Sequence, residues 1–177
     1  MTTYFELEDI YMREPTIKDK DKVWELRQEF IDNDESLDGS SGLKQANSYK
    51  EWFDSLEAYK HPTNPKFVPA TQFLTFRKSD DRLVGVVQVR HYLNDFLINY
   101  GGHIGDAIRK SERNKGYATR QIKLALEFCK SLGLDKVLVT CHDDNIASEK
   151  TILKNGGVFE NIFIYEGSNM KRFWIKL

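Results

Sequence analysis

The sequence contains little cysteine: only Cys129 and Cys141 carry a thiol among its 177 residues. Two cysteines cannot build a disulfide framework and suit a reducing compartment, so we expect a cytoplasmic protein. Long apolar runs are also missing, since the most apolar stretch, Leu83–Val89, is far too short to cross a bilayer. The first ten residues carry acids where a secretory signal carries a basic start and an apolar stretch. These absences argue against secreted, membrane-spanning and collagen-like proteins.

The sequence has no excess of charge of either sign. Lys and Arg number 26, Asp and Glu number 27, and the formal net charge is −1. A chain this close to neutral is not a dedicated nucleic-acid coat, so we expect no nucleic-acid partner and no membrane partner. Hydrophobic residues make up 40% and charged residues 30%, as in soluble globular domains. We predict one domain over residues 1–177.

Apolar spacing predicts an alternation of helices and strands. The expected helices are Asp19–Asp32, Tyr49–Tyr59, Gly116–Leu132 and Asn145–Asn155, and the expected strands are Ile10–Pro15, Gln72–Arg77, Leu83–Tyr92, Gly102–Ile108, Lys136–Cys141, Val158–Tyr165 and Lys171–Leu177. The pattern does not decide between helix, strand and loop for Leu93–Tyr100. This order predicts an α/β sheet covered by helices on both faces. The unit from Gly102 to Cys141 should be a right-handed parallel crossover, unless the sheet is mixed there.

A basic segment between a strand and a helix is the most informative part of the chain. Five cations, Arg109, Lys110, Arg113, Lys115 and Arg120, fall within twelve residues, against Glu112 alone. The following helix begins at Gly116, where a missing Cβ allows close approach to the backbone. Free N–H groups and the positive end of the dipole make a helix start a natural seat for phosphate. The segment has the charge to hold a pyrophosphate and a further phosphate.

Other phosphate, metal and nucleophile motifs are absent. The sequence contains no G-x-x-x-x-G-K-[ST], and Gly101, Gly102 and Gly105 do not form G-x-G-x-x-G. It contains no H-E-x-x-H, and its four histidines show no metal-ligand spacing, so we expect no metal. It also contains no G-x-S-x-G. An ATP-type P-loop, a dinucleotide fold and a serine hydrolase are therefore disfavoured.

Two segments resemble the cofactor motifs of the GCN5-related N-acetyltransferases, the GNAT family. Arg113-Asn114-Lys115-Gly116-Tyr117-Ala118 matches R/Q-x-x-G-x-G/A, and Asn145–Ser148 followed by Lys154–Gly157 resembles the second cofactor segment. The resemblance implies a GNAT-like acyl-CoA N-acyltransferase fold. Its sheet would be mixed but mostly antiparallel, with six or seven strands flanked by helices on both faces. Two of its strands would splay apart to admit the cofactor.

The resemblance also implies a cofactor and the residues that bind it. Acetyl-CoA would be the acetyl donor and coenzyme A the product. The pyrophosphate would lie on Arg113, Asn114, Lys115, Gly116, Tyr117 and Ala118. The pantetheine arm would run along Ala107, Ile108 and Arg109, with Asn145 and Ser148 near the sulfur.

The catalytic residues are less well defined by the resemblance. Many members carry a tyrosine acid seven residues after the asparagine, where this chain has Ile152. The alternative candidates for the general acid are Ser148, Cys141 and a bound water. For the base that deprotonates the amine, His103 is the leading candidate because its reference pKa is about 6.5; a packed histidine is the competing interpretation. Asp106 and the Asp32–Asp38 loop are rivals.

The acceptor is expected to be a primary amine of a small molecule or peptide. In the family the loop between the first two helices lines the acceptor site, so Asp34 and Glu35 are our candidates for binding a cationic amine. Asp32 and Asp38 add two further acids to this loop. We predict an N-acetyltransferase that works by direct attack, and a homodimer is possible through strands such as Lys171–Leu177. The alternatives are a non-catalytic acyl-CoA sensor or interaction module, and a phosphate-binding module for nucleotide or RNA.

Overall fold

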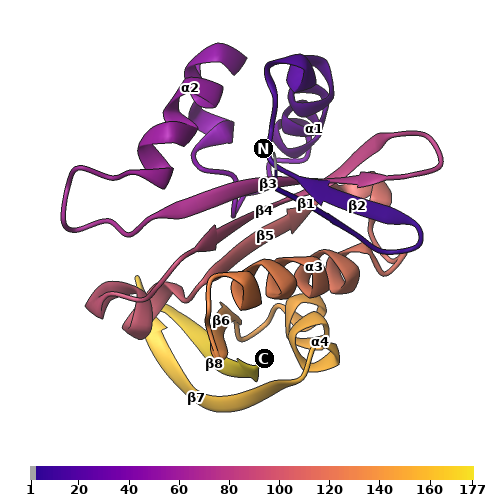
Figure 1. Ribbon diagram of the computed structural model, residues 1–177. Coiled ribbons are helices and arrows are strands. Elements are labelled where there is room, and N and C mark those ends of the chain that lie inside the picture. Colours follow the sequence, from indigo (N-terminus) through magenta and orange to yellow (C-terminus); the bar gives the residue numbers. More distant parts are fainter. Residues whose placement is uncertain (1–2) are drawn as a thin grey trace.

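The computed structural model describes residues 3–177, whose strands form two antiparallel sheets (Figure 1). The larger sheet has the order β1-β2-β3-β4-β5 and the smaller has the order β6-β8-β7. The larger sheet contains β1 (Tyr4–Glu6), β2 (Ile10–Arg13), β3 (Ala70–Arg77), β4 (Arg82–Arg90) and β5 (Ile104–Ile108). The smaller contains β6 (Lys136–His142), β7 (Gly157–Tyr165) and β8 (Ser168–Lys176).

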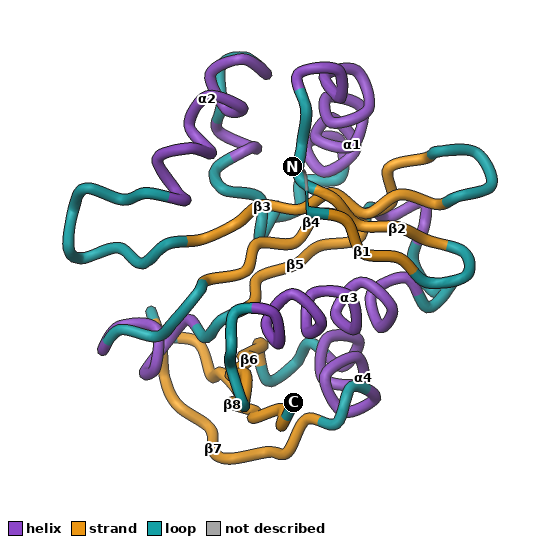
Figure 2. The backbone as a smooth tube through the Cα atoms, in the orientation of Figure 1, coloured by secondary structure: helices purple, strands orange, loops and turns teal. Residues whose placement is uncertain are grey.

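Helices cover both faces of the larger sheet (Figures 1 and 2). On one face lie α1 (Lys20–Asp32) and α2 (Tyr49–Lys60), and on the other lies α3 (Tyr117–Ser131). Helix α4 (Ile146–Lys154) packs against α3, β6 and β7. Short 3-10 turns cover Ile17–Asp19, Leu43–Gln45 and Lys110–Glu112, and a π-helical turn covers Leu97–Gly101. No helix in residues 3–177 is both long and apolar enough to span a bilayer.

The core has two apolar clusters, one on each face of the larger sheet. Residues that include Val23, Leu26 and Trp52 pack under α1 and α2 against Leu74 and Val86. The second cluster joins α3 to both sheets, and it includes Phe73, Val87, Ile122, Cys129 and Phe173. Strands β3 and β4 are buried along almost their whole length because helices cover both of their faces.

Strands β5 and β6 meet at a joint and are the facing edges of the two sheets. The His103 N–H donates to the Leu138 carbonyl at 2.8 Å, and the Leu138 N–H donates to His103 Nδ1 at 2.9 Å. Gly102 has φ +67° beside this joint, where a Cβ would lie 2.6 Å from the Leu138 oxygen. No ladder joins β5 to β6 within the described residues, so the edge of β5 beyond the joint stays open.

The predicted fold class is confirmed, with differences in detail. In residues 3–177 eight strands form two sheets, instead of six or seven strands in one, because the opening between β5 and β6 interrupts the ladder. The sequence pattern did not predict β1, which has three residues, or the π-helical turn that begins within Leu93–Tyr100. The expectation that Lys171–Leu177 pairs across a dimer is wrong for this strand, because β8 is already bonded on both sides, to β6 and β7.

Candidate active site

A groove of about 870 Å³ lies beside the open edge of β5. Its floor includes Asp106, Ala107 and Ile108 of β5, and one wall is the loop from Arg113 to Ala118, which we call the cofactor loop. The opposite wall is formed by Asn145, the N-cap of α4, and by the first residues of this helix, Ile146 to Ser148. The loop that follows α1 closes one end with Glu35, Ser36 and Asp38. Both sequence segments that resemble cofactor motifs therefore line the same groove.

The backbone of β5 offers hydrogen-bonding groups to this groove. The Arg109 N–H donates to Val84, and the Arg90 N–H donates to His103, which fixes the alternation of the ladder between β4 and β5. By this alternation Gly105 and Ala107 bond to β4, whereas the N–H groups of Asp106 and Ile108 point the other way. An extended ligand along this edge could therefore pair with β5 as a further strand would.

The cofactor loop carries a helix start that suits an anion. Asn114 and Gly116 both have positive φ, at +61° and +78°, so the chain turns sharply into α3. The first turn of α3 contains no acidic side chain. A Cβ on Gly116 would lie 2.9 Å from Nη1 of Arg120, so a larger residue meets both backbone strain and a close contact. This geometry supports the predicted phosphate seat.

Arg113 joins the cofactor loop to the loop after α1. Its Nε donates to the Ile108 carbonyl at 2.9 Å, and its Nη1 donates to Glu35 at 3.0 Å. The Phe30 ring lies 5.8 Å from the guanidinium carbon. The hydrogen bond and the charge of Arg113 lower the pKa of Glu35. Glu35 therefore lines the groove, as predicted for an acceptor residue, but its charge is already paired.

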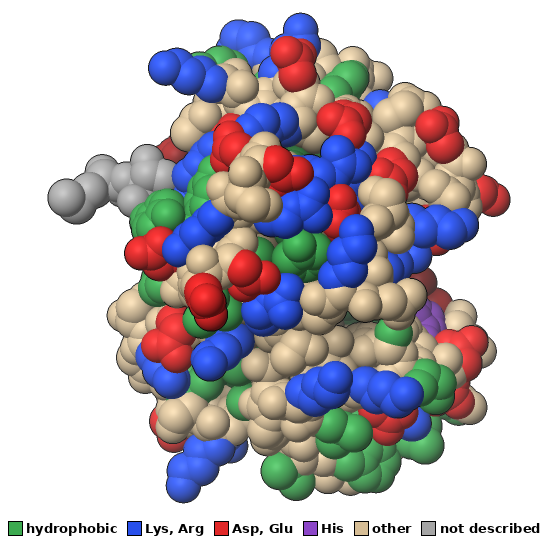
Figure 3. Space-filling model, turned by 90° about the vertical axis from the view of Figure 1, so that its right-hand side faces the viewer, with side chains coloured by type: hydrophobic (Ala, Val, Ile, Leu, Met, Phe, Trp, Pro, Cys, Tyr) green, Lys and Arg blue, Asp and Glu red, His purple; other side chains and the backbone are tan. Residues whose placement is uncertain are grey.

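The charge of the basic segment is largely neutralised by acids. The Glu112 side chain is 6% exposed and accepts from Arg77 (2.8 Å), Arg82 (2.7 Å) and Lys115 (2.8 Å). Burial opposes ionisation of Glu112, but Lys115 and Arg77 hold the pKa of this carboxyl below its usual range. Figure 3 shows the resulting interleaving of basic and acidic side chains on this side of the molecule. Ion pairs therefore hold the loop in place, and the loop does not present a patch of unpaired positive charge.

Helix α4 is anchored at both ends. The Asn145 side chain accepts from the Ser148 N–H at 3.1 Å, which caps the helix. Near its end, Asn155 Nδ2 donates to the Thr119 carbonyl of α3 at 3.1 Å. Ile152, at the position of the family's tyrosine, is buried and lines the groove, so this position offers no phenol. Lys150 and Lys154 also line the groove; Lys154 belongs to the second cofactor-like segment, whereas the sequence did not single out Lys150.

Asp106 is the acid on β5 in the groove. Its side chain is partly buried, and burial together with the negative charge of Asp38 raises the pKa of Asp106 to about 6. Gln121 opposes this shift through Nε2, which lies 3.5 Å from Oδ2 of Asp106. A carboxylate with a pKa this close to neutral can accept a proton in catalysis.

The structure places four predicted site residues away from the groove lining. Arg109 is buried and pairs with Glu29 at 2.7 Å and with Glu25 at 2.8 Å, so its side chain braces α1. Lys115 turns its ammonium to Glu112. Asp34 is exposed and does not line the groove. The sequence could not reveal the pairing of Arg109, because Glu25 and Glu29 lie about 80 residues earlier in the chain, whereas Glu112 is only three residues from Lys115.

His103, the leading base candidate, is the fourth of these residues. It is 4% exposed, and its Nδ1 accepts the Leu138 N–H at the joint between β5 and β6. Burial, and next the charge of Arg90, lower the pKa of His103 to about 4. The ring thus completes the joint between the two sheets and lies outside the groove lining, so His103 is not placed to act as the base.

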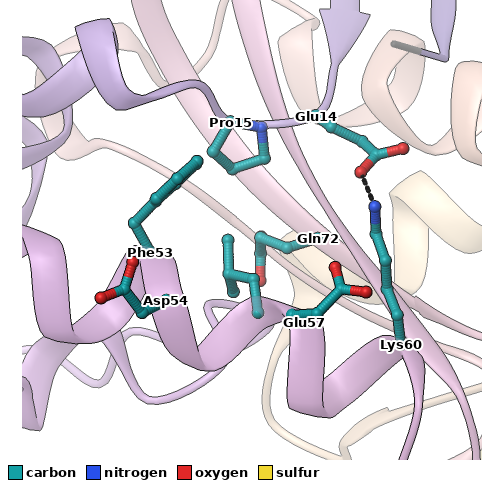
Figure 4. A pocket seen from close by; sticks show the side chains of 8 residues that line it. Glu14, Pro15, Phe53, Asp54, Glu57, Lys60 and Gln72 are labelled. Carbon is teal, nitrogen blue, oxygen red and sulfur yellow. Dashed lines mark ion pairs between the residues drawn. The ribbon is translucent and has the colours of Figure 1, made fainter. Parts of the chain in front are cut away.

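A second cavity, of about 290 Å³, lies on the α2 side of the molecule (Figure 4). Pro15 and Phe53 face it, and Glu14 pairs with Lys60 at one side. Gln72 forms part of its wall, and its amide is satisfied by the Gly39 carbonyl at 3.0 Å and the Ser41 hydroxyl at 2.7 Å. Neither cofactor-like segment reaches this cavity, so the groove beside β5 is the candidate active site.

Comparison with solved structures defines the class of fold. A ribosomal-protein-S5-alanine acetyltransferase from Vibrio fischeri has a TM-score of 0.70 at 18% identity, covering 98% of this chain and 96% of that chain. RimJ from Mycobacterium smegmatis, in complex with CoA-disulfide, has a TM-score of 0.70 at 17% identity, covering 94% and 81%. The microcin C7 self-immunity acetyltransferase MccE, in complex with acetyl-CoA and AMP, gives 0.69 at 18% identity, covering 97% and 94%. The fold is that of the GNAT acetyltransferases.

Residues 9–158 match the family model of the acetyltransferase (GNAT) domain, so the chain belongs to this family and is an acetyltransferase. A comparison with curated protein sequences gives no significant match. The family identified from the cofactor motifs is thereby confirmed.

Proposed function

We propose that this protein transfers the acetyl group of acetyl-CoA to a primary amine by direct attack, with residues 1–177 acting as one domain. The observation that carries the proposal is the position of Asp106, a proton-accepting carboxylate on the open edge of β5. It lies in the groove that both cofactor-like segments line. One site thus combines a proton acceptor, the free backbone N–H groups of β5 and a phosphate site at the start of α3.

Several groups in the groove fit acetyl-CoA. The start of α3 and the positive φ of Gly116 suit the pyrophosphate, and Lys150 and Lys154 add cations along α4. The exposed N–H groups of β5 suit the amides of the pantetheine arm. Relatives of the same fold were solved with CoA-disulfide and with acetyl-CoA. Asn145 and Ser148, at the start of α4, remain our candidates for the end near the sulfur.

The proposed reaction needs one proton acceptor and one donor to the developing negative charge. An acceptor that arrives as an ammonium first gives one proton to Asp106, directly or through one water, and the neutral amine nitrogen then forms its bond to the acetyl carbon. The second proton of that nitrogen goes to the leaving thiolate. The backbone N–H of Ile108 donates to the acetyl oxygen as negative charge develops there. The bond from the acetyl carbon to sulfur breaks, and coenzyme A leaves as product. No covalent enzyme intermediate is required.

The leaving thiolate needs little help from an acid. A thiol has a reference pKa of about 8.5, so its thiolate is a fair leaving group near neutral pH. A general acid adds about 10²–10⁴-fold, and positioning of the amine against the thioester can supply much of the rate. Ile152 is therefore compatible with turnover, and the half-buried Ser148 at the start of α4 is our candidate for a hydroxyl that donates to the sulfur.

The acceptor is proposed as a primary amine of a small molecule or a peptide. By name, one relative of the same fold acetylates an alanine of a ribosomal protein and another gives immunity to microcin C7. The acidic loop after α1 forms the end of the groove and suits an amine that arrives charged. We further propose a cytoplasmic location, because both cysteines are free thiols; a homodimer stays a prediction.

A non-catalytic acyl-CoA sensor is the second candidate, and Ile152 is the observation in its favour. The two are separated by release of free thiol when the protein is mixed with acetyl-CoA and a panel of amines. Amine-dependent thiol release identifies the enzyme. Tight binding of acetyl-CoA without thiol release from any amine would identify the sensor.

The site assignment is tested by placing a negative charge in the cofactor loop. Gly116→Glu and Arg113→Glu should abolish acetyl-CoA binding while the circular dichroism spectrum stays that of the wild type. Lys123→Glu is the matched control, since Lys123 is exposed on α3 and lies outside the groove lining. Retained binding in both loop variants would remove the assignment.

A further inference from the structure

The loop after α1 is pressed against β5 at a pair of glycines. A Cβ on Gly39 would lie 2.0 Å from the Gly105 carbonyl oxygen and 2.5 Å from the Asp106 nitrogen. Gly39 also has φ +65°, a conformation that other residues rarely adopt. This contact therefore requires glycine, and it fixes the position of the loop relative to β5.

The same loop is held from its other side by buried hydrogen bonds. Gln72 Nε2 donates to the Gly39 carbonyl at 3.0 Å, and Trp52 Nε1 donates to the Ser40 carbonyl at 2.8 Å. Gln72 and Trp52 are both almost fully buried. The residues next to the two glycines, Asp38 and Asp106, both line the groove and are thus held close together.

These two acids differ from the others in the groove because no cation pairs with them in the described part of the chain. The charged side chains that face the groove are Glu35, Asp38, Glu112, Arg113, Lys150 and Lys154, in addition to Asp106. Glu35 is paired with Arg113, and Glu112 is paired with three cations. Among residues 3–177, the Asp38 carboxylate accepts a hydrogen bond only from the Ser36 hydroxyl, at 3.3 Å, and the Asp106 carboxylate only from the Gln121 amide of α3, at 3.5 Å.

We propose that Asp38 and Asp106 together bind the ammonium form of the acceptor and exclude amines that carry a carboxylate on the neighbouring carbon. This proposal rests on the proposed function and names its substrate class: primary amines flanked by neutral groups, as in amino-acid amides, peptide N-termini and alkylamines. Free α-amino acids are excluded because their carboxylate would enter the field of two unpaired acids.

The expected size of this selection follows from Coulomb's law. Asp38 is exposed, so an effective dielectric constant of about 40 is appropriate, between surface and bulk values. At a separation of about 6 Å, one unit charge then changes the binding constant of another charged group by roughly tenfold. Neutralising Asp38 alone should therefore weaken the discrimination against a carboxylate about tenfold.

The first test compares alaninamide with alanine as acceptors for the acetyl-CoA-loaded protein. The ratio of their kcat/KM values is measured in the wild type, in Asp38→Asn and in the control Asp21→Asn, an exposed acid on α1 outside the groove lining. Because the ratio is compared between variants, the different pKa values of the two amines cancel. We expect Asp38→Asn to reduce the preference for alaninamide about tenfold and the control to leave it unchanged. An unchanged preference in Asp38→Asn would overturn the proposal.

The second test does not depend on turnover. The carboxyl ¹³C signal of Asp106, assigned by its loss in Asp106→Asn, is titrated in the wild type and in Asp38→Asn. We expect a lower midpoint in Asp38→Asn, because a negative neighbour has been removed, and a signal shift on adding alaninamide but not alanine. If both NMR results are obtained but no amine is acetylated, the proposed function is rejected and the ammonium site is retained. An unchanged midpoint and no response to alaninamide would reject the site.

Discussion

At the residue scale, Asp106 has a destabilising effect on the fold as well as a proposed role in the reaction. Its pKa is raised from 3.8 to about 6, chiefly by burial and next by Asp38. Since an acid with a raised folded pKa binds its proton more tightly in the folded state, folding is penalised once this proton is lost. The penalty is fully present above about pH 6 and disappears as the pH falls toward 4.

Asp106→Asn should therefore stabilise the protein while removing the proposed base. A shift of about two pKa units corresponds to about 3 kcal/mol at pH 8, or a rise in Tm of about 6–12 °C for a chain of this size. Loss of the base should lower kcat about 10²–10⁴-fold. Calorimetry measures the change in Tm, and the rate of thiol release measures the change in kcat.

The wild-type pH profile provides the companion measurement. We expect kcat/KM to fall on the acid side with a midpoint near pH 6, since protonated Asp106 cannot accept the amine proton. A lower Tm for Asp106→Asn at pH 8, or unchanged kcat, would contradict the account of this residue.

His103 is predicted to act on stability and not on catalysis. In His103→Ala the buried Leu138 N–H loses its acceptor, which should destabilise the fold by about 1–3 kcal/mol. His103→Asn supplies an oxygen at a similar position and should recover part of this loss. Denaturant unfolding measures both variants. A large drop in kcat for folded His103→Asn would restore the histidine as a candidate base.

At the scale of elements, the N-cap of α4 is the clearest point of local control. Asn145→Ala removes the acceptor of the Ser148 N–H and should lower stability by about 1 kcal/mol, which is about 2–4 °C in Tm. Asn145→Asp keeps an acceptor and should remain close to the wild type. Equal losses of Tm in both variants would show that the side-chain cap is not what stabilises this helix start.

The sequence predicted the elements whose own residues determine them. The apolar stripe of α3 and the caps at Asn145 and Gly133 gave helix positions to within a residue or two. Strand β1 could not be predicted, because its three residues are ordered by pairing with β2 and carry no pattern of their own. The same applies to the roles of Arg109 and His103, whose partners Glu29 and Leu138 are distant in sequence.

At the scale of the whole molecule, both thiols are protected by the core. Cys129 is fully buried and Cys141 is 5% exposed; burial raises the pKa of both thiols, that of Cys129 to about 12. Because the thiolate is the reactive form, we expect neither cysteine to react quickly with a thiol reagent in the native protein. Both should react in denaturant. Rapid labelling of the native protein would contradict this packing.

The groove lies between β5 of the larger sheet and helix α4, which follows the smaller sheet's β6, so a ligand that fills it should stabilise the molecule as a whole. Its walls come from β5 and the cofactor loop on one side and from α4, which follows β6, on the other. A thermal melt with acetyl-CoA, with ATP and NAD as controls, tests this most directly. At a hundred times its Kd, acetyl-CoA should add about 2.7 kcal/mol and raise Tm by roughly 5–11 °C. No rise with acetyl-CoA, or an equal rise with ATP, would contradict the assignment of the groove as an acetyl-CoA site.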